Sequence, residues 1–533
     1  MSTAAATGAA PTRREQLLGR LAEGGTWDVA VVGGGATGLG VALDAAARGF
    51  SVVLLESHDF AKGTSSRATK LVHGGVRYLA QGNIGLVREA LHERTTLLHN
   101  APHLAQPLPF VMPSYRLWET PFYGAGLKMY DALAGAARLG PTEFLGRSQT
   151  LACLPTVRPE GLKGGVKYWD AQFDDARLAL ALARSAAARG ALVVNYCAVT
   201  SLLHAQGKLA GLTCCDAESG RAFTVRSRCI VNATGVWVDQ LRQEDARTAG
   251  RPIGPMVAPS QGVHAVVDAQ FLPGRHALLV PRTSDGRVLF GVPWMGKVIL
   301  GTTDTPRGDL PREPRPFRQE LEFILGESGR YLVQAPRPQD VRSLWVGLRP
   351  LVKPQGDDGE PTKAISREHT VLVSRSGLVT VTGGKWTTYR AMAEDVLENT
   401  FAAGLLPRRS GGVTADLPLV GAPAAAAVAT PISAAPGLHL YGGEADQVAA
   451  LPGADRHLGG GLTIAMVRFA ARHEYARTVE DVLARRSRLL FTDAALAGSL
   501  AAEVGAVLQE ETGRDPQAAG LRELAASYLK MPA

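Results

Sequence analysis

VAVVGGGATGLG, residues 29–40, decides the fold of this chain: an apolar strand runs into a glycine turn, and a helix begins behind it. In such a unit Gly33 makes the tight turn, Gly35 lets the backbone approach a pyrophosphate, and Gly38 lets the helix pack closely on the strand. The helix N-terminus then presents free N–H groups and a positive dipole end to the phosphates. The segment therefore predicts a dinucleotide-binding unit.

The next strand, residues 51–55, narrows the choice of dinucleotide. It ends in Glu56, roughly 20 residues beyond the glycines, where a carboxylate binds the hydroxyls of a ribose. A carboxylate there repels a 2′-phosphate, which argues against NADP and leaves NAD or FAD. The glycine motif alone does not distinguish the two.

Length and composition set the outer limits. At 533 residues, with 46% hydrophobic and 20% charged residues, the chain predicts two or three folded domains. Its net charge of +8 favours anionic partners, and no nucleic-acid-binding module is recognisable. The five cysteines are scattered without metal-ligand spacing, so no metal site is expected. Residues 1–26 predict a disordered leader, and no apolar run approaches the roughly 18 residues of a membrane span.

Further along, strand and helix patterns alternate to about residue 400. Strands are expected at residues 191–196, 211–215 and 222–225, and a buried strand at 229–235 ends in Asn-Ala-Thr-Gly. Small residues at the end of a strand let the backbone lie close to a bulky group. The alternative interpretation is that these residues form an ordinary loop.

The rest of the chain changes in character twice. Residues 258–303 predict an antiparallel sheet, a suitable platform for a substrate. Residues 404–436, rich in Pro, Ala, Gly and Ser, predict a linker, and the tail beyond it is helical.

Taken together, several motifs resemble those of the FAD-dependent glycerol-3-phosphate dehydrogenases. The motifs are VVGGGATGLG (32–40 with its preceding valine), GTSSRATKLVHGGVRYL (63–79), VNATGVWVD (231–239), VPWMGKVILGTTDTP (292–306), VGLRPLV (346–352), VTGGKWTTYRAMAED (381–395) and ARTVEDVLARRSRLLF (476–491). The resemblance extends from about residue 27 to residue 495.

The resemblance implies an α/β fold: a Rossmann-type FAD-binding domain, an inserted antiparallel-sheet substrate domain and a C-terminal helical domain. The FAD-binding domain is expected to be discontinuous. The expected ranges are 27–90, 165–245 and 340–403 for the FAD-binding domain, 91–164 and 246–339 for the substrate- and membrane-facing domain, 404–436 for the linker and 437–533 for the C-terminal helical domain.

The family also implies an activity. It oxidises sn-glycerol 3-phosphate to dihydroxyacetone phosphate by hydride transfer to noncovalently bound FAD, and passes the electrons to a membrane quinone. The resemblance implies a homodimer attached peripherally to the inner face of the cytoplasmic membrane. Two alternatives stay open: a soluble oxidase that uses O₂, and a flavoprotein subunit that has lost catalysis.

Site residues follow from the motifs by resemblance. Cations for the substrate phosphate are Arg349, Lys385, Arg77 and Arg367, with Tyr78 beside them, because arginine forks suit a phosphate dianion. The expected FAD-binding residues are Gly33, Gly35, Gly38, Glu56, Thr64, Ser65, Ser66, Lys70, His73, Gly74, Gly75, Ala233, Thr234, Gly235, Gly384, Trp386 and Thr387.

A base is needed for the C2 hydroxyl proton. His264 stands at the substrate-side histidine of the family and is the candidate, with His73 as the rival nearer the flavin. The chain departs from the family at Gln261, where a lysine is common, and this leaves the local charge open.

Aromatic residues concentrate at positions 110–133, together with Arg116 and Lys128. Such a mixture is typical of a side that meets an anionic bilayer interface, and an aromatic core or a dimer contact is the alternative. The arginines of residues 468–488 predict a solvated face or a domain contact.

Overall fold

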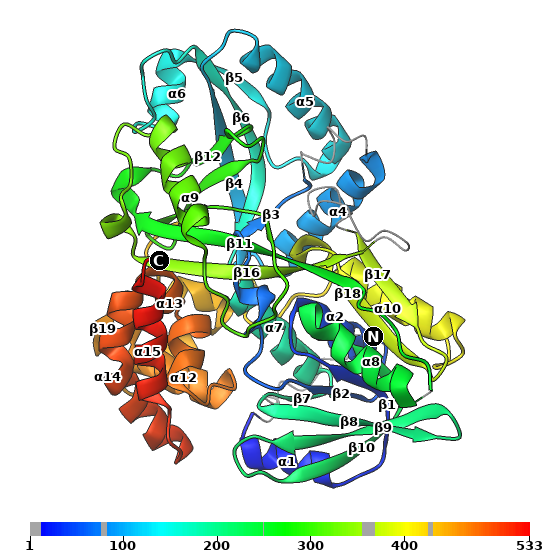
Figure 1. The fold of residues 1–533 in the computed structure, drawn as a ribbon. Helices are drawn as coiled ribbons and strands as arrows, with labels where there is room; N and C mark the ends of the chain where they lie inside the picture. Colours follow the sequence, from blue (N-terminus) through cyan, green and yellow to red (C-terminus); the bar gives the residue numbers. More distant parts are fainter. Residues whose placement is uncertain (1–11, 76–82, 249, 354–367, 425–429, 533) are drawn as a thin grey trace.

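A computed structural model describes residues 12–75, 83–248, 250–353, 368–424 and 430–532. Two sheets form its centre (Figure 1). In Figure 1 the ten-stranded sheet occupies the upper half, the eight-stranded sheet lies at the lower right, and the C-terminal helices, orange to red, lie at the lower left.

The eight-stranded sheet has the order β17-β18-β10-β1-β2-β7, with β8 and β9 attached through β10. Its four central strands, β18, β10, β1 and β2, run parallel, so their carboxyl ends meet at one edge. The strands are β1 (Thr26–Val32), β2 (Val52–Leu55), β7 (Leu192–Val194), β8 (Cys197–Ala205), β9 (Lys208–Asp216), β10 (Ala222–Asn232), β17 (His369–Val373) and β18 (Leu378–Gly383).

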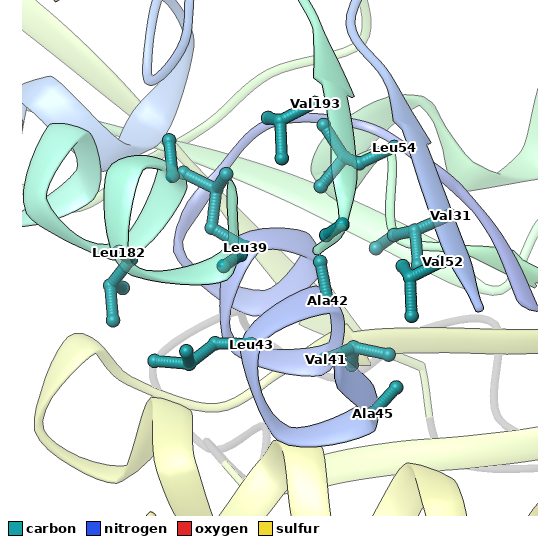
Figure 2. Close-up of a cluster of buried hydrophobic side chains, with 14 of the residues drawn as sticks. Val31, Leu39, Val41, Ala42, Leu43, Ala45, Val52, Leu54, Leu182 and Val193 are labelled. Carbon is teal, nitrogen blue, oxygen red and sulfur yellow. The ribbon is translucent and has the colours of Figure 1, made fainter. Parts of the chain in front are cut away.

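The core of this unit lies around α2 (Ala36–Ala47), which follows the glycine turn. Its apolar side chains pack against valines and leucines of β1, β2 and β7 and against Leu182 of α7 (Asp175–Ala188), as Figure 2 shows. Leu39, Val41 and Leu54 are all fully buried or nearly so. This packing holds the N-terminus of α2 at the carboxyl edge of the sheet.

The ten-stranded sheet has the order β15-β11-β14-β13-β12-β4-β6-β3, with β16 on β11 and β5 on β6. The strands are β3 (Leu71–Val72), β4 (Ala105–Ser114), β5 (Glu143–Gly146), β6 (Gly164–Phe173), β11 (Val257–Asp268), β12 (Ala277–Val280), β13 (Leu289–Trp294), β14 (Lys297–Gly301), β15 (Thr305–Pro306) and β16 (Ser343–Val352). Both β6 and β16 fall in ranges that we assigned to the FAD-binding domain, yet they pair in this second sheet.

Helices cover both sheets and build the C-terminal part. They are α1 (Arg14–Ala22), α4 (Ile84–Asn100), α5 (Glu119–Ala134), α6 (Arg147–Cys153), α8 (Val238–Thr248), α9 (Arg318–Tyr331), α10 (Tyr389–Ala402), α11 (Ala445–Ala449), α12 (Ile464–His473), α13 (Leu489–Thr492), α14 (Ala494–Thr512) and α15 (Ala518–Leu529). None of the helices in the described residues is both long and apolar enough to span a bilayer.

The structure corrects three expectations drawn from local sequence. Within the predicted disordered leader, residues 14–22 form α1, because Leu17 and Leu21 are buried in the core and the Arg14 guanidinium pairs with Asp216. The described parts of the predicted linker 404–436 are packed, with Leu419 and Ile432 buried.

The third correction concerns β10. The two strands expected at residues 222–225 and 229–235 are one strand, β10, which ends at Asn232. Its first half pairs antiparallel with β9 and its second half parallel with β1, so one strand serves two partners.

Candidate flavin and substrate site

A cavity of about 380 Å³ opens at the carboxyl edge of the parallel strands. Its wall contains eleven of the predicted site residues: Gly33, Gly35, Glu56, Thr64, Ser65, Ala233, Thr234, Gly235, Gly384, Lys385 and Trp386. These residues follow β1, β2, β10 and β18, so segments far apart in the sequence meet because the strands run parallel.

The glycine turn leaves no room for side chains. Gly33 has φ +109°, and a Cβ there would lie 2.6 Å from the carbonyl oxygen of Ala233. A Cβ on Gly38 would lie 2.0 Å from the Gly33 carbonyl oxygen, and one on Gly35 would lie 3.1 Å from Ser65 Oγ. The close backbone approach that a dinucleotide requires is therefore present, and these residues fit FAD.

Polar contacts hold the wall around this turn. The Glu56 carboxylate accepts from the Gly34 N–H at 2.7 Å and from the His58 N–H at 2.9 Å. Ser65 Oγ accepts from the Ala36 N–H at 2.9 Å, and the Ser65 carbonyl accepts from Trp386 Nε1 at 2.9 Å. The loop that carries Ser65 is thus bound both to the start of α2 and to the segment after β18.

Seven predicted cofactor residues lie off this wall: Gly38, Ser66, Lys70, His73, Gly74, Gly75 and Thr387. Gly38 sits behind the turn, and Lys70 is fully buried with φ +65°. Lys70 Nζ lies 2.7 Å from an Asp175 carboxylate oxygen and 4.6 Å from the ring centroid of Trp345. Burial lowers the pKa of Lys70 to about 7, against the attraction of Asp175.

Two of the predicted substrate-site residues, His264 and Arg349, lie on the neighbouring strands β11 and β16. Arg349 is on β16, and the next residue, Pro350, lines the cavity, so this strand reaches the flavin site. The Arg349 guanidinium donates to the Thr303 carbonyl at 2.9 Å and lies 3.3 Å from Asp304 Oδ1, with its side chain 20% exposed. These partners orient the guanidinium while part of it stays accessible.

His264 lies on β11 opposite Trp345 of β16 and stacks on its indole, with ring centroids 4.2 Å apart. Its Nε2 is 3.0 Å from Thr69 Oγ1, and its Nδ1 is buried without a hydrogen-bond partner among the residues that the structure describes. Burial, reinforced by the charges of Lys70 and Arg349, holds the pKa of His264 well below its usual value. The imidazole is therefore neutral and able to accept a proton.

Lys385 lies between two cavities. It lines the cavity described above and also a second cavity of about 210 Å³ beside Glu368 and His369.

Gln261, the departure from the family pattern, is buried and donates from Nε2 to a Glu320 carboxylate oxygen. Arg77, Tyr78 and Arg367 lie outside the described residues.

Several wall residues were not predicted as site residues, and three of them carry charged or aromatic side chains: Lys62, Trp237 and Arg312. Trp237 belongs to the motif VNATGVWVD, so a signal for it was present. The Arg312 guanidinium lies 3.9 Å above the Trp237 ring centroid. Arg312 comes from the irregular segment between β15 and α9, where no local pattern marks a binding residue.

Comparisons with known proteins agree with this geometry. A family model described as "FAD dependent oxidoreductase" matches residues 28–390, and one described as "C-terminal domain of alpha-glycerophosphate oxidase" matches residues 412–519. These matches confirm the predicted FAD-binding α/β fold and its cofactor, and the cavity at the carboxyl edge is the candidate FAD site.

Individual relatives are similar over most of the chain. The mitochondrial glycerol-3-phosphate dehydrogenase of Schizosaccharomyces pombe is 37% identical, covering 95% of this chain and 87% of that protein. The human mitochondrial enzyme of the same name is 45% identical over 73% of this chain and 54% of its own length. The structure of the Bacillus halodurans glycerol-3-phosphate dehydrogenase complexed with FAD superposes with a TM-score of 0.76 at 30% identity, covering 98% of both chains.

Proposed function

Because this chain belongs to the family of FAD-dependent glycerol-3-phosphate dehydrogenases, we propose that it oxidises sn-glycerol 3-phosphate to dihydroxyacetone phosphate. The observation that carries the proposal is that a cation, Arg349, and a buried imidazole, His264, lie on paired strands beside the FAD cavity, whose wall carries a second cation, Lys385. Arg349 precedes a residue of the cavity wall, Lys385 lies on that wall, and His264 is on the strand next to Arg349.

Each of these residues has a role in the proposed reaction. The Arg349 guanidinium and the Lys385 ammonium bind the substrate phosphate, together with Arg77, Tyr78 and Arg367. His264 accepts the proton of the C2 hydroxyl as the C2 hydride departs. FAD, when bound, supplies the two-electron acceptor for that hydride. No cysteine or histidine lies among the described residues of the cavity wall, which supports noncovalent binding.

An anaerobic titration tests the proposal. We expect sn-glycerol 3-phosphate to bleach the visible flavin absorbance of the purified protein with one substrate per flavin, whereas glycerol, which lacks the phosphate, leaves it unchanged. Adding a ubiquinone or menaquinone analogue should restore the absorbance quickly, and air should restore it slowly. An unchanged spectrum would contradict the proposed substrate, and faster recovery in air would favour the oxidase alternative.

We further propose that the electrons pass to a membrane quinone, at the inner face of the cytoplasmic membrane. The helix α5 and the turn before it support a membrane contact. Leu117 is 80% and Phe122 65% exposed, and Trp118 and Met129 are also exposed. Single exposed apolar side chains are common on protein surfaces, but four large ones on one short segment indicate an interaction site.

The predicted aromatic cluster at residues 110–133 divides in the structure. Phe110 and Tyr130 are buried core residues, as the alternative held, and Tyr123 is half-buried against the core. The exposed apolar side chains on residues 117–129 lie in the same segment as the exposed basic side chains of Arg116 and Lys128. Its mixture of apolar and basic side chains suits the interface of an anionic bilayer.

Serine in place of Leu117, Trp118 and Phe122 should release the protein from anionic liposomes. Each exposed apolar side chain contributes on the order of 2 kcal/mol when it enters an apolar phase. Sedimentation with vesicles measures the effect, and quinone reduction should fall while reduction of a soluble dye by sn-glycerol 3-phosphate survives.

A matched variant with serine at Ile253, Phe317 and Val333 removes three exposed apolar residues from other elements. It should still sediment with the liposomes. Equal sedimentation of both triple variants would place the membrane contact elsewhere.

A further inference from the structure

The loop that forms one wall of the FAD cavity is held by the C-terminal helical domain. Residues 61–65, between β2 and β3, all line the cavity. The residues that flank them, Asp59 and Ser66, both contact buried arginines that lie more than 400 positions later in the chain. In Figure 1 the C-terminal helices lie beside α7, next to this loop.

Arg488 makes the contact at Ser66. Its side chain is fully buried, and Nη2 donates to the Ser66 carbonyl at 2.8 Å and to Asp175 Oδ1 at 3.0 Å. Lys70 Nζ donates to the same carbonyl at 2.8 Å and to Asp175 Oδ2 at 2.7 Å. One carbonyl thus receives two cationic donors, and one carboxylate, which also accepts from the Ala68 N–H at 3.0 Å, binds both.

The position of the Ser66 carbonyl affects the part of the loop that lines the FAD cavity. It follows directly on Ser65, whose Oγ accepts from the first N–H of α2 and whose carbonyl accepts from Trp386. These contacts fix the position of the loop relative to the N-terminus of α2, where a diphosphate binds. A loop released from Arg488 loses one of its anchors on the side away from the cavity.

Asp59 anchors the other end of the loop. The Arg486 guanidinium donates to Asp59 Oδ1 at 3.0 Å, and Arg485 and Arg486 both bind Oδ2. Burial would raise the pKa of Asp59, but the two guanidiniums hold it below its usual value. Both arginines belong to a short π-helical turn, Asp481–Arg486, just before Arg488.

We propose that Arg488 is a positioning residue for FAD: through the Ser66 carbonyl it holds residues 63–66 against the start of α2, so that FAD affinity depends on the docking of the C-terminal domain. Arg488 itself is not on the cavity wall. The inference concerns the cofactor and is independent of the proposed substrate.

The control for this experiment is Arg177, another arginine at the same domain contact. Its Nη2 lies 2.8 Å from a carboxylate oxygen of Glu474, and both side chains are buried. Arg177 Nη1 also donates to the Arg486 carbonyl at 3.2 Å, but among the described residues Arg177 makes no hydrogen bond to residues 61–66 and does not line the cavity. The variant Arg177→Met therefore disturbs the domain contact without touching residues 63–66.

The measurement is FAD release from the holoenzyme on serial dilution, followed by the rise in flavin fluorescence. We expect Arg488→Met to raise the dissociation constant for FAD by about tenfold or more, because it removes charge-assisted hydrogen bonds. Arg177→Met should lower the Tm comparably and change the dissociation constant by less than about twofold. Arg488→Lys, which keeps the charge, should recover part of the affinity.

Two results would overturn the proposal. An unchanged dissociation constant in Arg488→Met removes Arg488 from cofactor positioning, and equal loss of FAD in Arg488→Met and Arg177→Met reduces it to general stability. If Arg488→Met does not fold, Arg488→Lys is compared with Arg177→Lys in the same way, and equal FAD affinity in that pair rejects the proposal.

Discussion

Alanine in place of Arg349 should lower kcat/KM for sn-glycerol 3-phosphate by about a hundredfold or more, because truncating a charge-assisted contact to a dianion costs about 2–5 kcal/mol. The guanidinium is oriented by the Thr303 carbonyl and Asp304, and it remains partly exposed. Steady-state kinetics with a soluble dye measure the effect, and the ratio of flavin to protein absorbance should stay unchanged because Arg349 does not line the FAD cavity.

Two further variants show whether the effect is specific to the guanidinium of Arg349. Arg349→Lys should recover only part of the activity, since a point charge does not reproduce the two-pronged contact of a guanidinium. Arg342 precedes β16, the strand that carries Arg349, and pairs with Asp268 at 2.6 Å in a largely exposed position. Arg342→Ala should therefore retain near-normal kcat/KM. Full activity in Arg349→Ala would remove this residue from phosphate binding.

Part of the wall of the candidate FAD cavity could be predicted from the sequence, because the signals for it are local. The strand–glycine–helix unit at residues 29–40 and Glu56 are local signals, and both lie on the cavity wall as expected of a parallel sheet. Asn-Ala-Thr-Gly after β10 was a similar signal, because small residues at the end of a central strand permit close approach. Local backbone requirements therefore predicted one side of the site.

Contacts between distant segments could not be predicted in this way. Lys70 belongs to a recognised motif, but its side chain contacts Asp175 and Trp345 and does not line the cavity. This placement depends on residues 105 and 275 positions later in the chain. The sequence left the arginines at 485–488 open between a solvated face and a domain contact. The structure shows the domain contact, because carboxylates from other elements face their buried guanidiniums. Charge pairing across the fold leaves no periodic pattern in either partner.

Glutamine in place of His264 should lower kcat by about a hundredfold to ten-thousandfold, the usual contribution of a general base, with little change in KM. The amide keeps a polar atom within reach of Thr69 Oγ1 and most of the packing on Trp345, but it does not accept the proton. Stopped-flow reduction of the flavin by sn-glycerol 3-phosphate measures the chemical step directly. His276→Gln, which changes a half-buried histidine outside the cavity wall, should leave that rate near normal.

The pH profile gives an independent check on the role of His264. A base works only when unprotonated, so kcat/KM falls as the pH drops through its pKa. Since burial and the charges of Lys70 and Arg349 hold that pKa below 6.5, the acid limb should lie below pH 6.5 in the free enzyme. Arg349→Met removes one of these positive charges and should move the acid limb of its residual activity to higher pH. If His73→Gln abolishes flavin reduction while His264→Gln keeps both the rate and the acid limb, His73 is the base instead.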